Sequence, residues 1–494
     1  MSFSVFLEFY FGISQTMFGN KKPNIFLQFT SILPLLTSFC NLNPKPICLS
    51  GNMTSNNSQL HIFFLPALSP GHMIPVIEMA KLVASRGVMA TIVTTAHNLA
   101  FVSRTISTYS TKIKIVTIKF PYAEVGLPEG CEIIDSDTPP DILFRVIKAL
   151  RLLQEPMEQL LSSYQPDCLV ADAFFSWATN SAAKFNIPRL VFHVACLFSL
   201  CASHSIELYE PQKKVSSDSE TFIIPSLPGE IKLTKMQLPA DLPKTGVEAE
   251  YINKMVKAVH ESVENSYGFI INSFYELEKD YVDYYRNVIG RKAWHIGPLS
   301  LCHADNIEEK SQRGKESSIA ENECLKWLDS RKPDSVVYVG FGSLVNFSDS
   351  QLMEIALGLE ASEKQFIWVV KKSKRNEQEK EEWLPEGFEK RTVVMATWPV
   401  SYEQIYTEKL VTDVLKIGVS VGAQTCDGIV GGIIKSEAIE KAVNRIMEGI
   451  EAEEMRSRAK AFAKKARQSV KEGGSSYSDL NSLIEELSLK SLKH

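Results

Sequence analysis

Residues 59–87, QLHIFFLPALSPGHMIPVIEMAKLVASRG, contain the alternation on which the fold depends. QLHIFFLPAL is a continuous apolar run, as expected for a strand that is buried on both faces of a sheet. In the stretch that follows, Ile74, Ile77 and Leu82 recur at helical spacing, and Gly87 ends the pattern. A buried strand followed by such a helix is typical of a parallel sheet that helices cover on both sides.

The same alternation continues along the first half of the chain. Further strand-like runs lie at residues 88–96, 113–121, 167–175, 189–197 and 267–274, and helical patterns lie at 141–161 and 177–186. Because apolar strands alternate with helices, this half predicts a doubly wound α/β domain. Ligands of such domains bind beyond the carboxyl ends of the strands.

Residues 298–322 are polar and charged, and we interpret them as a linker. After the linker the alternation restarts. Strands are expected at 335–343 and 365–372, and helices at 348–363, 402–418 and 435–490. The last helical stretch is broken at Gly473 and Gly474. The sequence therefore predicts two α/β domains that face a cleft. We expect the first domain at 59–297 and the second at 323–494, with the last helices packing back on the first domain.

Bulk composition limits the class of protein. The 494 residues are 45% apolar, which is enough for the cores of two or three domains. The net charge of −5, with mixed signs, argues against nucleic acid as a partner. The nine cysteines show no CxxC spacing, which favours reduced thiols in the cytoplasm over disulfides or a metal site.

Residues 1–58 differ from the rest of the chain, because they hold aromatic and apolar runs without a repeating pattern. The run after Lys21 and Lys22 is shorter than the roughly 20 apolar residues of a spanning helix. It also begins too far from Met1 for an ordinary signal peptide. We interpret the segment as an extension, disordered or not native, ahead of a start at Met53, and we expect no stable membrane insertion.

Two residues form a candidate catalytic pair, because each lies at the end of an expected strand. His72 lies where the first strand passes into a helix, and Asp172 ends the strand in LVADAFF. A histidine with a pKa of ~6.5 can take a proton from a hydroxyl near neutral pH. An aspartate bonded to the far ring nitrogen would fix its tautomer. The alternatives are a capping or core role for His72 and a helix-capping role for Asp172.

Three residues of the second half are candidates for ligand contacts. Ser343 follows a strand and a glycine, so it could donate to a phosphate oxygen; the alternative is a simple turn. Glu403 and Gln404 could bind adjacent sugar hydroxyls; the alternative is an ordinary helix N-terminus. The chain has neither GxGxxG nor GxxxxGKS/T, so the standard dinucleotide and P-loop fingerprints are absent.

From about Gln59 onward the chain resembles the plant family-1 UDP-glycosyltransferases, especially the branch acting on phenolic and terpenoid acceptors. The resemblance rests on ordered blocks, among them HIFFLPALSPGHMIPVIEMAKLVASRG, PDCLVADAFFSWATNSAAKFNIPRLVFH, SYGFIINSFYELE, CLKWLDSRKPDSVVYVGFGSL and WPVSYEQIYTEKLVTDVLKIGV. It implies the GT-B fold, with two Rossmann-like domains facing a cleft. The acceptor would bind in the first domain and the UDP-sugar mainly in the second.

The resemblance also implies roles and partners. His72 would be the general base, Asp172 the acid that orients it, Ser343 a contact to the donor phosphate, and Glu403 and Gln404 the pair that holds the sugar. The reaction would move a hexose, glucose above others, to a hydroxyl of a flavonoid, phenolic or terpenoid with inversion. UDP-sugar would be a co-substrate, with no metal and no other cofactor, and the protein a cytoplasmic monomer.

One part of the family signature is missing. The signature begins with Trp-x-Pro-Gln, passes through His-Cys-Gly-Trp-Asn-Ser and a Glu, and ends at Trp-Pro and the acid-Gln pair. Here GFEKR at 387–391 runs almost directly into MATWPVSYEQ at 395–404. The second domain is therefore expected to be internally truncated near 391–395, without the groups that hold uracil, ribose and diphosphate. The alternative function is an inactive acceptor-binding protein, or an unstable isoform, that lacks the UDP cradle.

Overall fold

The structure is a computed structural model that describes residues 59–132, 138–238, 247–302, 327, 330–332, 335–340, 347–369, 404–423 and 433–492. The expected extension at 1–58, most of the expected linker and the junction at 391–395 lie outside the described residues.

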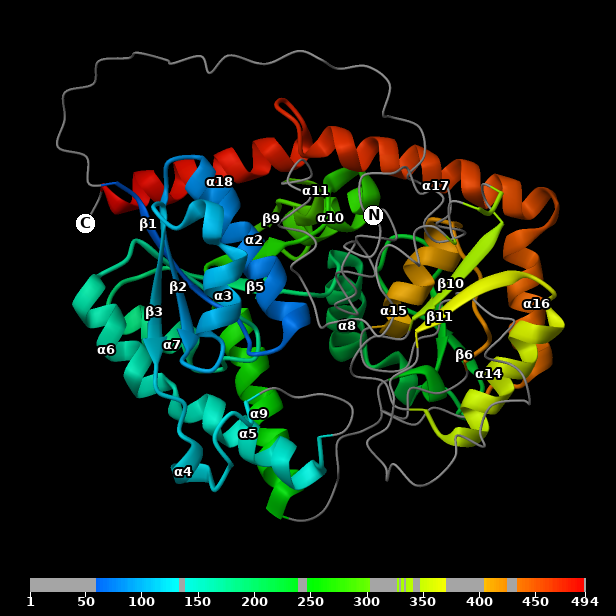
Figure 1. The fold of residues 1–494 in the computed structure, drawn as a ribbon, viewed down its shortest axis with the longest axis horizontal. Helices are drawn as coiled ribbons and strands as arrows, with labels where there is room; N and C mark the ends of the chain where they lie inside the picture. Colours follow the sequence, from blue (N-terminus) through cyan, green and yellow to red (C-terminus); the bar gives the residue numbers. More distant parts are fainter. Residues whose placement is uncertain are drawn as a thin grey trace.

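A parallel sheet forms the centre of the first half (Figure 1). Its strands are β1 (His61–Leu65), β2 (Met89–Thr95), β3 (Ile113–Ile118), β4 (Cys168–Asp172), β5 (Arg189–His193), β8 (Gly268–Ile271) and β9 (Ala293–His295). Their order in the sheet is β3-β2-β1-β4-β5-β8-β9, and each neighbouring pair runs parallel. The order reverses direction at β1 and β4, which is where such sheets bind ligands.

Helices connect these strands and cover both faces of the sheet. They are α2 (Pro70–Ser85), α3 (Leu99–Thr105), α4 (Tyr122–Val125), α5 (Pro140–Leu152), α6 (Gln154–Tyr164), α7 (Ala178–Lys184), α8 (Leu197–Tyr209), α9 (Val247–Glu264), α10 (Tyr275–Asn287) and α11 (Leu299–Cys302). A short antiparallel pair, β6 (Thr221–Ile223) and β7 (Lys232–Thr234), lies beside α8 in sequence. The single helical pattern expected at 141–161 is two helices, because Pro156 lacks the N–H that a continuous helix needs and lies instead in the first turn of α6.

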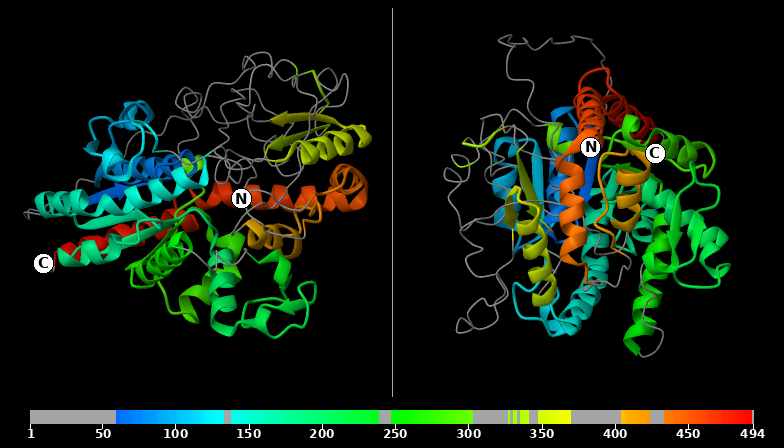
Figure 2. Two further views of the ribbon diagram at one scale, coloured as in Figure 1. Left: turned by 90° about the horizontal axis from the view of Figure 1, so that it is seen from below. Right: turned by 90° about the vertical axis from the view of Figure 1, so that its right-hand side faces the viewer.

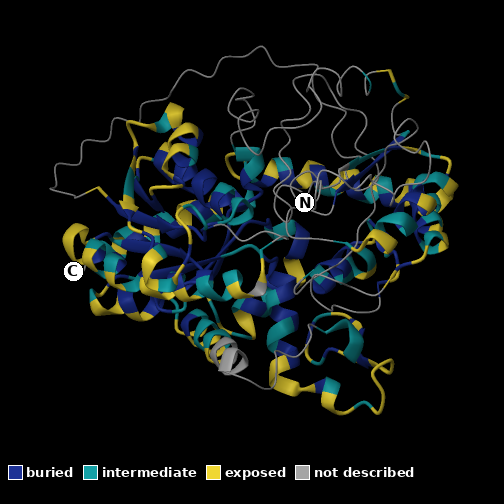
Figure 3. Cartoon of the chain, turned by 60° about the horizontal axis from the view of Figure 1, so that its bottom comes forward, coloured by how far each residue is buried: buried dark blue, intermediate teal, exposed yellow. Residues whose placement is uncertain are grey.

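Side chains of the buried strands alternate between the two faces, as the apolar runs predict. In β5, Leu190 and Phe192 belong to the core beneath α2, whereas Val191 belongs to the core beneath α8 and α10. All five residues of β1 are buried, so this strand is also covered on both faces of the sheet. Figure 3 shows the buried strands at the centre and the exposed residues on the outer faces of the helices. The predicted α/β fold class is confirmed.

The second half contributes a smaller described sheet. Strands β10 (Val336–Gly340) and β11 (Gln365–Val369) pair in parallel, joined by helix α14 (Asp349–Ala361). Ser348 is the N-cap of α14 and accepts from the N–H of Gln351 at 3.3 Å. Helix α16 (Ser436–Met447) packs against α14.

The chain ends in two long helices that link the halves. Helix α17 (Gly449–Ser469) and helix α18 (Ser475–Ser491) run across the whole molecule in Figure 1 and in the left view of Figure 2. Leu480, Leu483 and Leu487 of α18 are buried in the core of the first sheet. The break between the helices falls at Gly473 and Gly474, as the sequence predicts.

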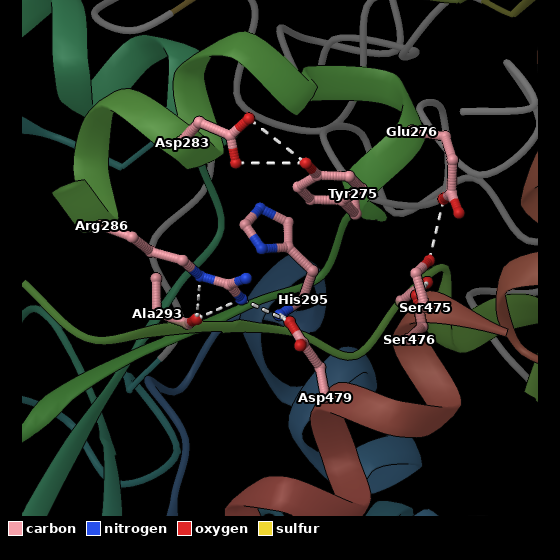
Figure 4. A network of polar contacts seen from close by, with 10 residues as sticks. Tyr275, Glu276, Asp283, Arg286, Ala293, His295, Ser475, Ser476 and Asp479 are labelled. Carbon is pink, nitrogen blue, oxygen red and sulfur yellow. Dashed lines mark hydrogen bonds and ion pairs between the residues drawn. The ribbon is translucent and has the colours of Figure 1, made fainter. Parts of the chain in front are cut away.

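Polar contacts fix α18 to the edge of the first sheet (Figure 4). The Asp479 carboxylate accepts from the Arg286 guanidinium at 2.6 Å and from the backbone N–H of His295 at 2.8 Å. Ser475 donates to Glu276 at 2.8 Å. Removal of the Asp479 carboxylate would leave the N–H of His295 without this acceptor and the Arg286 cation with only the neutral Ala293 carbonyl among these contacts.

The first prediction concerns this attachment. Asp479→Ala is expected to lower the free energy of unfolding by about 1–3 kcal/mol, because it removes a charge-assisted and a backbone hydrogen bond. Urea unfolding followed by circular dichroism measures the change. Glu485→Ala, an exposed position on the same helix, is the control and should change stability little. Equal effects of both substitutions would contradict the attachment.

The second prediction concerns His295, whose ring is fully buried. Neither ring nitrogen has a partner among the described residues, and burial, then the charge of Arg286, lower the pKa of His295 to about 3. The folded state therefore resists a proton that the unfolded chain accepts below its pKa of ~6.5. The free energy of unfolding therefore keeps its full value above about pH 6.5 and falls, by up to about 1.4 kcal/mol per pH unit, as the pH drops towards 3.

His295→Phe removes this titration, so its stability should fall less between about pH 7 and about pH 5 than that of the wild type. Urea unfolding at the two pH values measures the difference. Val288→Ala, at an exposed position, changes no titratable group and should keep the wild-type slope. A His295→Phe protein with an unchanged slope would show that this ring does not carry the acid sensitivity.

Candidate active site

The candidate site is built where two neighbouring strands end. β1 and β4 pair in parallel, so their carboxyl ends lie at one edge of the sheet. Asp172 is the last residue of β4, and His72 lies in the first turn of α2, which follows β1. The turn is regular, because the Ser69 carbonyl accepts from the N–H groups of His72 and Met73 at 3.1 and 2.8 Å.

The two side chains are in direct contact. Nδ1 of His72 lies 2.6 Å from Oδ2 of Asp172. The histidine is 17% exposed and the aspartate 1% exposed, so the imidazole lies between a buried carboxylate and the outside. Because Nδ1 faces a carboxylate, it carries the proton of the neutral ring, and the lone pair that can accept a proton is on Nε2.

The surroundings keep the carboxylate charged. Burial raises the pKa of Asp172, but the charge and hydrogen bond of His72 and the backbone N–H of Phe174 outweigh it and lower this pKa overall. That N–H donates to Oδ1 of Asp172 at 3.1 Å. An ionised Asp172 can stabilise the imidazolium that forms when His72 accepts a proton.

An aromatic side chain that the sequence analysis did not single out flanks this pair. The Phe174 ring lies 5.4 Å from the His72 ring, centroid to centroid, and the residue is 55% exposed. An exposed large aromatic beside a basic imidazole is suited to contact the apolar body of a ligand. The available signal was its position two residues after the strand-ending acid.

Of the three expected donor contacts, only Gln404 lies among the described residues. It begins α15 (Gln404–Lys409), a helix that continues as a wider π-helical turn at Leu410–Val414. Helix α15 packs against α8, where Thr407 Oγ1 lies 3.5 Å from Ser199 Oγ. Ser343 and Glu403 lie outside the described residues, so the expected donor contacts stay predictions.

The described part of the chain contains neither a cluster of metal-binding side chains nor a membrane-spanning helix. Among the described residues, no group of three or more histidine, cysteine, aspartate or glutamate side chains is placed to hold a metal ion. In the same part of the chain, no helix is both long enough and apolar enough to cross a membrane.

Solved structures share this architecture. The crystal structure of UGT73P12 from Glycyrrhiza uralensis, complexed with glycyrrhetinic acid 3-O-monoglucuronide, matches with a TM-score of 0.80 and 36% identity over 88% of this chain and 97% of that chain. UGT71G1 of Medicago truncatula, complexed with UDP-glucose, shares the fold with a TM-score of 0.67 at 21% identity, over 88% and 100% of the two chains. The protein is therefore an α/β protein of the GT-B class.

Sequence relatives define the family within that class. A scopoletin glucosyltransferase of Nicotiana tabacum is 48% identical over 474 residues, which cover 87% of this chain and 98% of the relative. The UDP-glucose flavonoid 3-O-glucosyltransferase 7 of Fragaria ananassa is 49% identical, over 88% of this chain and 97% of the relative. The chain belongs to the plant family-1 UDP-glycosyltransferases. No protein-family model matches it.

The alignment lengths bear on the missing part of the signature. The match to the tobacco protein runs over 474 positions but uses only 87% of the 494 residues here. Some positions of that relative therefore have no counterpart in this chain. The family signature segment that is missing between residues 391 and 395 is a position in the chain where these unmatched residues of the relative would fall.

Proposed function

We propose that the chain transfers glucose from UDP-glucose to a hydroxyl of a small phenolic, flavonoid or terpenoid plant metabolite, with inversion at the anomeric carbon. The observation that carries the proposal is the 2.6 Å contact between His72 and the buried Asp172 at the sheet edge. The names of the relatives support the donor and the acceptor class, since they include scopoletin, flavonoid and anthocyanin glucosyltransferases.

The chemistry follows from the orientation of the pair. An acceptor hydroxyl beside Nε2 of His72 loses its proton to that nitrogen as its oxygen attacks the anomeric carbon. A glycosidic C–O bond forms while the bond between that carbon and the UDP oxygen breaks, so UDP leaves with the bonding electrons. Attack from the face opposite the leaving group inverts the configuration. Asp172 remains ionised and stabilises the imidazolium.

The first domain, residues 59–297, would hold the acceptor. Phe174 supports this assignment, because its exposed ring beside His72 can stack on the rings of a flat phenolic acceptor. The second domain, 323–494, would hold the donor, with Ser343 on a phosphate and Glu403 and Gln404 on the sugar hydroxyls.

The remaining parts of the proposal concern setting and partners. The protein would act as a cytoplasmic monomer with no cofactor beyond its UDP-sugar co-substrate. The free cysteines of the described residues fit a reducing compartment. The net charge of −5 supports a small-molecule enzyme rather than a nucleic-acid-binding protein.

The third prediction tests the catalytic pair. With UDP-glucose and a panel of flavonoids and triterpenoids, His72→Ala should reduce product formation by about 10²–10⁴-fold, because it removes the general base. Asp172→Asn should also lower kcat, because an amide cannot stabilise the imidazolium. Product is measured by liquid chromatography with mass spectrometry. His260→Ala, at a half-exposed histidine, is the matched control and should retain wild-type turnover.

A second candidate function is an acceptor-binding protein, or an unstable isoform, without catalysis. It is favoured by the signature residues missing between 391 and 395, since each lost charge-assisted hydrogen bond removes about 1.5–3 kcal/mol and aromatic stacking about 1–3 kcal/mol of binding.

The fourth prediction separates the two functions by calorimetry with UDP. The transferase proposal expects UDP to bind with a Kd in the range of about 1 μM–1 mM, as is usual for enzyme substrates. A chain with the complete family signature inserted at 391–395 is the positive control. No heat of binding for the present chain, together with binding and turnover by the control, would favour the inactive isoform.

A further inference from the structure

A buried cation lies behind the catalytic aspartate. Arg189 is the first residue of β5 and is only 2% exposed. Its Nη2 donates to the main-chain carbonyl of Asp172 at 2.9 Å and to that of Ala171 at 3.3 Å. Its Nη1 donates to the Thr179 hydroxyl at 3.3 Å. The guanidinium therefore holds the end of the strand on which Asp172 is placed.

Arg189 and His72 reach Asp172 from opposite faces of the sheet. Arg189 alternates along β5 with Leu190, so it shares the face of Val191, which lies in the core beneath α8 and α10. Its partner Thr179 comes from α7 on that face. His72 comes from α2, which covers the other face. Asp172 thus has a guanidinium bonded to its main-chain carbonyl from one face and an imidazole bonded to its carboxylate from the other.

The guanidinium has no carboxylate in contact among the described residues. Its bonded partners are neutral oxygens, and its Nε has no partner there. A buried charge without an opposite charge nearby is strongly unfavourable. Burial lowers the pKa of Arg189 to about 10, and Asp172 is the group whose charge opposes that shift. The guanidinium is thus still protonated at neutral pH, with Asp172 as its nearby negative charge.

Another histidine beside the site does not provide this positive charge. His193 ends β5, and its Nδ1 accepts from the Ala195 N–H at 3.0 Å. That bond fixes the neutral tautomer with the proton on Nε2. Burial above all lowers the pKa of His193 to about 4, although Asp172 opposes the shift. His193 is therefore neutral at neutral pH, so of these three side chains Arg189 and His72 are the ones whose positive charge can compensate Asp172.

We propose that Arg189 is the buried counter-cation of Asp172, a positioning residue that keeps the carboxylate ionised and thereby lets His72 remain a neutral base. With Arg189 present, the Asp172 charge is compensated from the far face of the sheet, so the imidazole need not be protonated before the acceptor arrives. Without Arg189, the uncompensated carboxylate favours protonation of His72, and the base is blocked by its own proton.

The test follows the His72 ring in the full chain by NMR, with histidines labelled at Cε1 and His72→Asn used to assign its signal. The role given to Arg189 rests on the proposed function, but the NMR titration of His72 needs neither the UDP-sugar nor the acceptor molecule. An inactive chain therefore leaves the result readable, and failure of the transferase proposal is distinguished from failure of this one.

Arg189→Met should raise the midpoint of the His72 titration by about one pH unit or more, because it removes a positive charge near the Asp172–His72 pair. Arg189→Gln, which keeps an amide donor for the strand carbonyls, should raise it in the same way if Arg189→Met does not fold. Arg189→Lys retains the charge and should restore the wild-type midpoint. His193→Asn, a neutral replacement for a neutral ring, should leave the midpoint in place.

Three results would overturn the proposal. The first is an unchanged His72 midpoint in the folded Arg189→Met or Arg189→Gln protein. The second is an equal rise in His193→Asn, which would assign the effect to general disturbance of the site. The third needs no variant: a His72 ring that is already protonated in the wild type at about pH 7.5 would show that Arg189 does not leave it neutral. If the transferase is active, the acidic limb of its pH profile should move with the NMR midpoint.

Discussion

The contact between His72 and Asp172 depends on the parallel pairing of β1 and β4. Two residues a hundred positions apart meet because both strands end at the same edge of the sheet. Burial makes the charge of Asp172 depend on its surroundings, because a carboxylate that is 1% exposed stays ionised only where hydrogen-bond donors and positive charge lie close to it. The backbone N–H of Phe174 and the His72 ring bond the carboxylate directly, and the Arg189 guanidinium bonds the main-chain carbonyl of the same residue.

Much of the first domain could be predicted from sequence, because its strands are continuous apolar runs with helices between them. His72 and Asp172 could be chosen because each follows such a run. Phe174 and Arg189 could not, since an aromatic after a strand is usually expected in a core and an arginine before one is usually expected on the surface. Their importance comes from the contacts that the tertiary fold creates, which no local pattern reports.

Other differences also have physical reasons. β9 is three residues long, too short for a recognisable periodic signal, and it is held by its pairing with β8 and by Asp479 of α18. The helix expected at 402–418 gives way to a π-helical turn after Lys409, a local change in hydrogen bonding that residue type does not encode. Ser343 and Glu403 stay predictions from the family resemblance, whereas Gln404 is placed on a helix that packs against α8.

Whether His72 is a base oriented by Asp172 can be decided from the protonation of its two ring nitrogens. Nitrogen-15 chemical shifts of His72 at neutral pH distinguish the two neutral tautomers and the imidazolium. A base oriented in this way has a neutral ring, with the proton on Nδ1, facing Asp172, and no proton on Nε2. A ring that carries its proton on Nε2 would contradict this role, because that nitrogen could not accept a proton from an acceptor hydroxyl.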